Sequence, residues 1–131
     1  MFSEGEVREV AQAFANALDH NEFERAITML APTCRYDLSA ASFTSESVLI
    51  GPTAIIESCR WHDARARNLF DRVEYYSVVA HVEGMTAIIR FSDVLEKLGV
   101  QHTYSCRQSV SVNQYGLVDG IVQEARNVRA G

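Results

Sequence analysis

Polar and apolar side chains alternate strictly along residues 101–113. One set is polar: Gln101, Thr103, Ser105, Arg107, Ser109, Ser111 and Asn113. The other set is His102, Tyr104, Cys106, Gln108, Val110 and Val112. A period of two predicts a strand with one face toward solvent and one toward the interior of the protein. Gln108 then lies inside, where a buried amide needs hydrogen-bond partners or a ligand.

The pattern of the flanking segments predicts further strands, at 72–82, 85–96 and 117–126. Turn residues separate them: Glu83-Gly84, Leu98-Gly99 and the stretch 113–116. Short strands joined by such turns are typical of an antiparallel meander.

The first 70 residues show a helical period instead. Ser3 and Glu6 have the spacing of a capping box, and apolar side chains at Val7, Val10, Phe14, Ala17 and Leu18 predict a helix over 4–19. A short second helix, buried through Phe23, Ile27 and Leu30, should end before Pro32. Gly51-Pro52 should open a third helix, whose apolar stripe comprises Ile55, Cys59, His62, Ala66 and Leu69.

Between the second and third helices, CRYDL (34–38) reads as a strand and 39–47 as a loop. Cys34, Tyr36 and Leu38 form its more apolar alternate set and should face inward. Arg35 and Asp37 then lie on the outer face. Asp37, although a carboxylate on a strand, is therefore expected to be structural.

Three N-terminal helices packed on a curved antiparallel sheet make an α+β fold, a cystatin-like cone. The 131 residues, 47% hydrophobic and 22% charged, suit one domain spanning 1–131. A net charge of −5 argues against binding nucleic acid. Apolar windows are too short to span a membrane and the N-terminus is too acidic for a signal peptide, so a cytoplasmic location is expected.

Cysteines and histidines show no metal-binding spacing. Cys34, Cys59 and Cys106 form no CxxC pair, which is typical of reduced, buried thiols. The histidines form neither HxxxH nor HExxH. We expect no metal and no cofactor.

Candidate chemistry comes from the predicted hairpin around Leu98-Gly99. In this hairpin the residue numbers of two paired residues should sum to about 197. Asp93 is then opposite Tyr104, with His102 diagonally adjacent. A carboxylate, a phenol and an imidazole at one cavity mouth could perform general acid–base catalysis, with Asp93 and His102 as catalytic residues. The alternative is a structural polar cluster that closes the end of the sheet.

Two stretches resemble known proteins of the nuclear-transport-factor-2-like, SnoaL-like superfamily. EVAQAFANALDHNEFERAITMLAPT (9–33) is similar, without gaps, to the N-terminal helices of ketosteroid isomerases, and APTCRYDLSAASF (31–43) is similar to a stretch of scytalone dehydratase. The resemblance covers the whole chain as a pattern of elements. It implies a cone that holds a small apolar molecule, and a homodimer formed through the sheet.

Most catalytic residues of these enzymes are replaced at the matching positions of this chain. At the isomerase positions this chain has Phe14 for the tyrosine, Leu38 for the base and Gln108 for the protonated aspartate. At the dehydratase positions Leu18 and Leu38 replace two tyrosines, while Asp19 keeps the aspartate. The resemblance therefore predicts the fold and not the reaction.

The substrate-binding set predicted for the cone is Tyr36, His62, Tyr104, Gln108, Phe14 and Leu38. His62 lies on the apolar stripe of the third helix and should face the sheet, either as a core residue or as a site residue. The leading hypothesis is binding of a small apolar molecule, with cofactor-free isomerase, cyclase or lyase chemistry. The alternative is a non-catalytic dimeric interaction domain.

Overall fold

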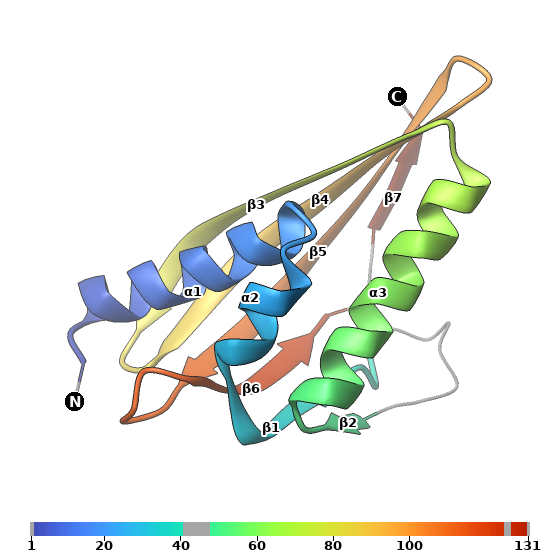
Figure 1. Ribbon diagram of the computed structural model, residues 1–131. Helices are drawn as coiled ribbons and strands as arrows, with labels where there is room; N and C mark the ends of the chain where they lie inside the picture. The colour runs from blue at the N-terminus through green and yellow to red at the C-terminus, as the bar shows by residue number, and fades with distance from the viewer. Residues whose placement is uncertain (1, 41–47, 125–126, 131) are drawn as a thin grey trace.

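The computed structural model describes residues 2–40, 48–124 and 127–130 (Figure 1). Its helices are α1 (Glu4–Asp19), α2 (Phe23–Thr28) and α3 (Pro52–Leu69). Its strands are β1 (Leu30–Asp37), β2 (Val48–Ile50), β3 (Arg72–Glu83), β4 (Thr86–Lys97), β5 (Val100–Val112), β6 (Val118–Gln123) and β7 (Asn127–Ala130). The predicted loop at 39–47 lies largely outside the described residues.

The strands form one sheet in the order β2-β1-β6-β5-β4-β3, and β7 pairs with β5. The expected meander is present, since β3, β4, β5 and β6 pair antiparallel in sequence. The sheet is nevertheless mixed rather than wholly antiparallel, because β1 runs parallel to β6. The first strand is also longer than predicted, and the short β2 pairs with it.

The hairpin turns occur where the sequence predicts them. Gly84 has φ +61°, and Leu98 and Gly99 have φ +51° and +80°. Left-handed backbone of this kind matches the right-handed twist of the flanking strands in tight hairpins. The turn at Leu98-Gly99 sets the register of β4 against β5 and so determines which side chains of the two strands lie opposite each other.

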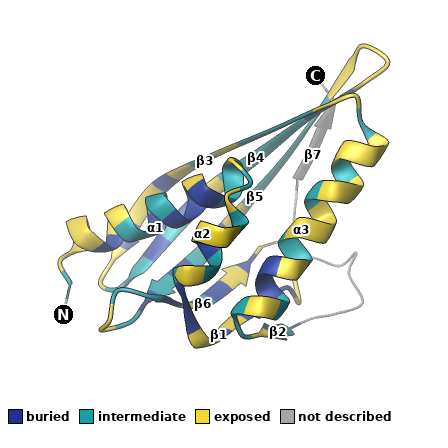
Figure 2. Cartoon of the chain, in the orientation of Figure 1, coloured by how far each residue is buried: buried dark blue, intermediate teal, exposed yellow. Residues whose placement is uncertain are grey.

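All three helices lie on one side of the sheet (Figure 1). α1 begins with the predicted capping box, in which the Glu6 amide donates to Ser3 Oγ at 3.1 Å and the Ser3 amide donates to Glu6 Oε1 at 3.0 Å. Its inward side chains, Val7, Phe14 and their neighbours, are fully buried against the sheet (Figure 2). The prediction of three helices packed on a curved sheet is confirmed.

α1 also covers the free edge of β3. The ladder is irregular between Val79 and His81, and side chains of α1 satisfy the backbone there. Gln12 Oε1 accepts from the Val79 amide at 3.0 Å, and Arg8 Nη1 donates to the Val79 carbonyl at 2.9 Å. These two contacts protect the backbone of β3 at Val79 from pairing with another chain.

Candidate functional site

Asp93 lies between two tyrosines on the helix-covered face of the sheet. β4 pairs Asp93 with Tyr75 of β3 on one side and with Tyr104 of β5 on the other. Directly paired residues of antiparallel strands share a face and lie within side-chain reach. All three are half-buried. The pairing of Asp93 with Tyr104, predicted from the turn, is confirmed.

His102 occupies the neighbouring row of the same face. It pairs with Leu95, which places it diagonally next to Asp93 as predicted. Its ring meets the ring of Phe70 edge to face, with centroids 6.4 Å apart. Phe70 therefore packs beside the imidazole as an aromatic neighbour.

The paired residues Tyr75, Asp93 and Tyr104 form one row across the sheet. A second carboxylate, Asp63 of α3, contacts this row from the helix-covered side. Tyr75 Oη donates to Asp63 Oδ1 at 2.7 Å, and Asn21 Nδ2 donates to Asp63 Oδ2 at 3.2 Å. Arg67 Nε lies 3.1 Å from both carboxylate oxygens. Asp63 therefore connects α3 to β3 and to the turn between α1 and α2, and it forms an ion pair with Arg67.

The surroundings keep Tyr75 protonated. Burial raises the pKa of Tyr75 well above its ordinary value, and the hydrogen bond to Asp63 and the charge of Asp93 raise it further. A phenol in this state donates one hydrogen bond and is a poor proton source. Tyr75 thus orients Asp63, while Asp93 and Tyr104 complete the row.

Tyr36, Gln108 and Gln123 form a closed hydrogen-bond network at the deep end of the same face. Gln108 Nε2 donates to Tyr36 Oη at 2.7 Å and to Gln123 Oε1 at 3.1 Å, and Tyr36 donates its own proton to Gln123. Their exposed fractions are only 6–8%. The buried position predicted for Gln108 is confirmed, and its amide donors are used by the protein itself.

Two further predicted substrate-binding residues, Phe14 and Leu38, are core side chains. Phe14 is 0% exposed, and Leu38 belongs to the same buried cluster as Cys34 and Tyr36. Asp37 pairs with the exposed Val122 on the outer face, as predicted. Hydrogen bonds from Ser39 lower the pKa of Asp37, which therefore closes a turn after β1 as a carboxylate.

The position predicted for His62 is wrong. His62 is exposed, and its ring contacts Trp61 with centroids 5.0 Å apart. The inward face of α3 instead runs through Ile55, Cys59, Asp63 and Ala66, while Leu69 is exposed. If Ile55, Cys59 and Ala66 face the sheet, helical spacing allows either residue 62 or residue 63 to face it as well. The apolar pattern favoured His62.

Asp63 and Tyr75 are the site residues that the sequence did not reveal. Neither residue belongs to a motif that would mark it as a site residue. Helical spacing alone was compatible with an inward Asp63, since it lies four residues after Cys59 and three before Ala66.

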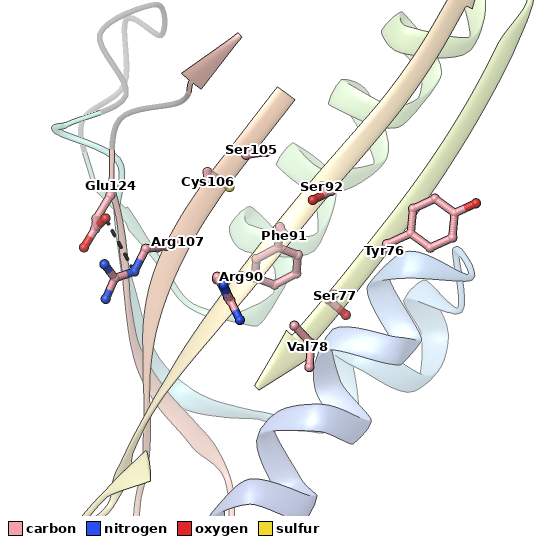
Figure 3. Close-up of a pocket in the computed structure, with 10 residues that line it drawn as sticks. All are labelled: Tyr76, Ser77, Val78, Arg90, Phe91, Ser92, Ser105, Cys106, Arg107 and Glu124. Atoms are coloured by element: carbon pink, nitrogen blue, oxygen red, sulfur yellow. Dashed lines mark ion pairs between the residues drawn. The ribbon is translucent and has the colours of Figure 1, made fainter. Parts of the chain in front are cut away.

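A shallow trough of about 480 Å³ lies on the opposite, outer face of the sheet (Figure 3). Its lining includes Tyr76, Val78, Arg90 and Arg107. It is thus separated from Asp93 and His102 by the sheet itself. Within the described ranges, no cluster of three or more His, Cys, Asp or Glu could hold a metal ion, and no described helix is long and apolar enough to cross a membrane.

The fold is similar to that of solved proteins of different kinds. An LEH-like epoxide hydrolase from M. tuberculosis matches with a TM-score of 0.66 and 15% identity, over 95% of this chain and 84% of that one. The epoxide hydrolase/cyclase-like enzyme of pyran ring formation in the polyether salinomycin matches with a TM-score of 0.68 and 11% identity, over 100% of this chain and 95% of that one. No protein-family model and no curated protein matches the chain.

The chain has the nuclear-transport-factor-2-like fold. The resemblance stated from the sequence is confirmed at this level. A de novo designed protein with a curved β-sheet also matches, with a TM-score of 0.63 and 20% identity over 94% of this chain and 87% of that one. Since a designed protein shares it, the nuclear-transport-factor-2-like fold by itself implies no activity, and function has to be argued from the site.

Proposed function

We propose that the chain binds a small, mostly apolar carbonyl compound against the inner face of the sheet and catalyses proton transfer on it. The observation that carries the proposal is Asp93, a half-buried carboxylate flanked by Tyr75 and Tyr104, with His102 diagonally adjacent. Acid–base groups gathered on one covered face are the arrangement that general acid–base catalysis requires. Structural neighbours described as an epoxide hydrolase and a cyclase-like enzyme support this class of chemistry.

In the proposed reaction Asp93 is the base. Its carboxylate removes a proton from the carbon next to the substrate carbonyl, and the electron pair moves onto the carbonyl oxygen. Tyr104 and His102 donate hydrogen bonds to this developing oxyanion, which stabilises it. When the substrate carries a C=C bond between its β and γ carbons, the product of this step is a conjugated dienolate. The protonated Asp93 then delivers the proton to the γ carbon while the carbonyl re-forms and the C=C bond moves to the α,β position, giving an isomer with no cofactor consumed.

Other predicted site residues support the site without touching the reacting atoms. Gln108 and Tyr36 form its floor, because their hydrogen bonds are made to each other and to Gln123. Asp63 and Tyr75 hold α3 over the row. Its contacts with Tyr75, Asn21 and Arg67 make Asp63 a positioning residue.

Solvent-proton exchange tests the proposal directly. The protein is incubated in D₂O with a panel of aromatic and terpenoid ketones, and deuterium entering the position next to the carbonyl is followed by NMR. Asp93→Asn should slow the enzyme-dependent exchange by about 100-fold or more, the usual size of a general base effect, while ketone binding measured by line broadening persists. His102→Asn should reduce exchange by a smaller factor.

The matched control is Asp119→Asn, an exposed aspartate on β6, which should leave exchange unchanged. Exchange that survives in an Asp93→Asn/His102→Asn double variant would rule out the proposed base. Binding without any exchange in the wild type would leave a binding protein rather than an enzyme.

A non-catalytic homodimer formed through the sheet is the second candidate function. It is favoured by Tyr76, Val78 and Val122, large side chains that are 50–54% exposed on the outer face. Sedimentation over a concentration series tests it. A dimer should dissociate in Val78→Glu, and its melting temperature should rise with protein concentration; a monomer at every concentration would exclude it.

A further inference from the structure

Two arginines lie directly opposite each other in the outer-face trough. Arg90 of β4 and Arg107 of β5 are register partners, and both are exposed. Like charges at directly paired positions of neighbouring strands destabilise a sheet. This chain nevertheless places them together, although its net charge is −5.

The nearby acidic groups do not neutralise the pair. Arg107 Nε lies 3.9 Å from Glu124 Oε2, a long contact between half-exposed groups (Figure 3). Exposed ion pairs of this kind contribute little. No ion pair with Arg90 occurs among the described residues. The trough therefore carries an uncompensated positive charge at its centre.

The remaining lining suits a flat ligand. Two rows cross the same three strands: Val78, Arg90 and Arg107 in one, and Tyr76, Ser92 and Ser105 in the next. The serine hydroxyls can donate hydrogen bonds beside the guanidinium groups, and the exposed Tyr76 and Val78 supply apolar surface along β3. The volume of about 480 Å³ is within the range of small-molecule sites.

We propose that this trough binds a small aromatic anion, whose carboxylate or phosphate group is held by Arg90 and Arg107 and whose ring lies against Tyr76 and Val78. Guanidinium groups match the geometry of both anions, which they bind with charge-assisted hydrogen bonds. The bound anion would also remove the repulsion between the paired arginines. This site is independent of the proton-transfer site, which lies on the other face of the sheet.

A second copy of the chain, the occupant that the homodimer described above would place on this face, is a poorer fit to the trough. A twofold interface brings the same patch from both subunits together, so a second copy centred here would add two more arginines to the pair already present. An anionic small molecule supplies the opposite charge instead.

NMR titration at 0.15 M salt tests the proposal with three probes of similar shape: benzoate, phenyl phosphate and the neutral benzyl alcohol. We expect saturable shifts of the Tyr76 ring and the Arg90 and Arg107 side chains with at least one anion, and none with benzyl alcohol. Comparing benzoate with phenyl phosphate identifies the preferred anionic group. Arg90→Ser should weaken affinity by about tenfold or more, because a charge-assisted contact is lost.

The thermal stability of the unliganded protein separates a binding role from a structural one. Arg90→Ser relieves like-charge repulsion, so its melting temperature should be no lower than that of the wild type. Arg35→Ser, an equal change of charge at an exposed position of β1, is the control and should keep wild-type affinity. Absence of binding by both anions, equal weakening in the two variants, or equal binding of benzyl alcohol would overturn the proposal.

Discussion

Gln108 is a buried amide whose hydrogen bonds connect distant parts of the chain. Its alternation on β5 predicts a buried amide that needs partners, and its partners are Tyr36 and Gln123. These residues lie 72 and 15 positions away along the chain. Gln108 and Gln123 become register partners only through the pairing of β5 with β6. The sequence therefore predicted that Gln108 needs hydrogen-bond partners, but it did not predict which residues these are.

The network predicts an order of stabilities for two similar substitutions. Gln123→Leu removes the acceptor of the Tyr36 proton and of one Gln108 donor, so buried donors lose their partners. This should cost about 1–3 kcal/mol of unfolding free energy. Gln108→Leu removes a donor but leaves the hydrogen bond from Tyr36 to Gln123 intact, and it should cost less. Urea unfolding of both variants measures the difference.

Gln114→Leu, an exposed glutamine in the turn before β6, serves as the control and should unfold like the wild type. Equal losses in Gln108→Leu and Gln123→Leu would contradict the assigned direction of the hydrogen bonds.

Among the elements, α3 departs most from its prediction. Its bounds follow from Gly51-Pro52, but its inward face is rotated by one residue, so that Asp63 and not His62 approaches the sheet. Only Ile55 and Ile56 are fully buried on it. The second half of the helix is therefore held mainly by the polar contacts of Asp63 rather than by apolar burial.

Asp63→Ala should loosen this half of the helix selectively. The variant loses the contacts to Tyr75, Asn21 and Arg67, at a cost of about 1–3 kcal/mol for partners left without an acceptor. Amide hydrogen exchange should accelerate in the last two turns of α3 and remain unchanged in β5. Glu57→Ala, an exposed acidic residue on the same helix, should not alter exchange; uniform acceleration throughout the protein would contradict a local role.

At the scale of the whole molecule, one apolar core joins α1 to the sheet and to the first turns of α3. Phe14, Ile55, Ile89 and Ile121, from two helices and two strands, are all at most 1% exposed. Since their side chains belong to one buried cluster, α1 and the sheet should unfold together.

Phe14→Ala tests whether α1 and the sheet unfold together. It also distinguishes a role of Phe14 in stability from a role in ligand binding. Removing a fully buried phenylalanine should lower the unfolding free energy by about 3–5 kcal/mol, in one transition seen alike by helical and aromatic signals. The ketone-binding behaviour of the folded fraction should not change, because Phe14 lies in the core. Tyr115→Ala, at a 76% exposed position, is the control. Two separate transitions would show that α1 folds independently of the sheet.

The sequence by itself determined the local features: the capped first helix, the hairpin turns, the register of Asp93 against Tyr104 and the outward position of Asp37. Each depends on neighbouring residues, on side-chain periodicity or on a turn that fixes pairing across a few positions. Only the tertiary structure decided the parallel pairing of β1 with β6 and the rotation of α3 that brings Asp63 to Tyr75. These features arise from contacts between segments distant in the chain, where packing and polar partners select among registers that the apolar pattern leaves equally possible.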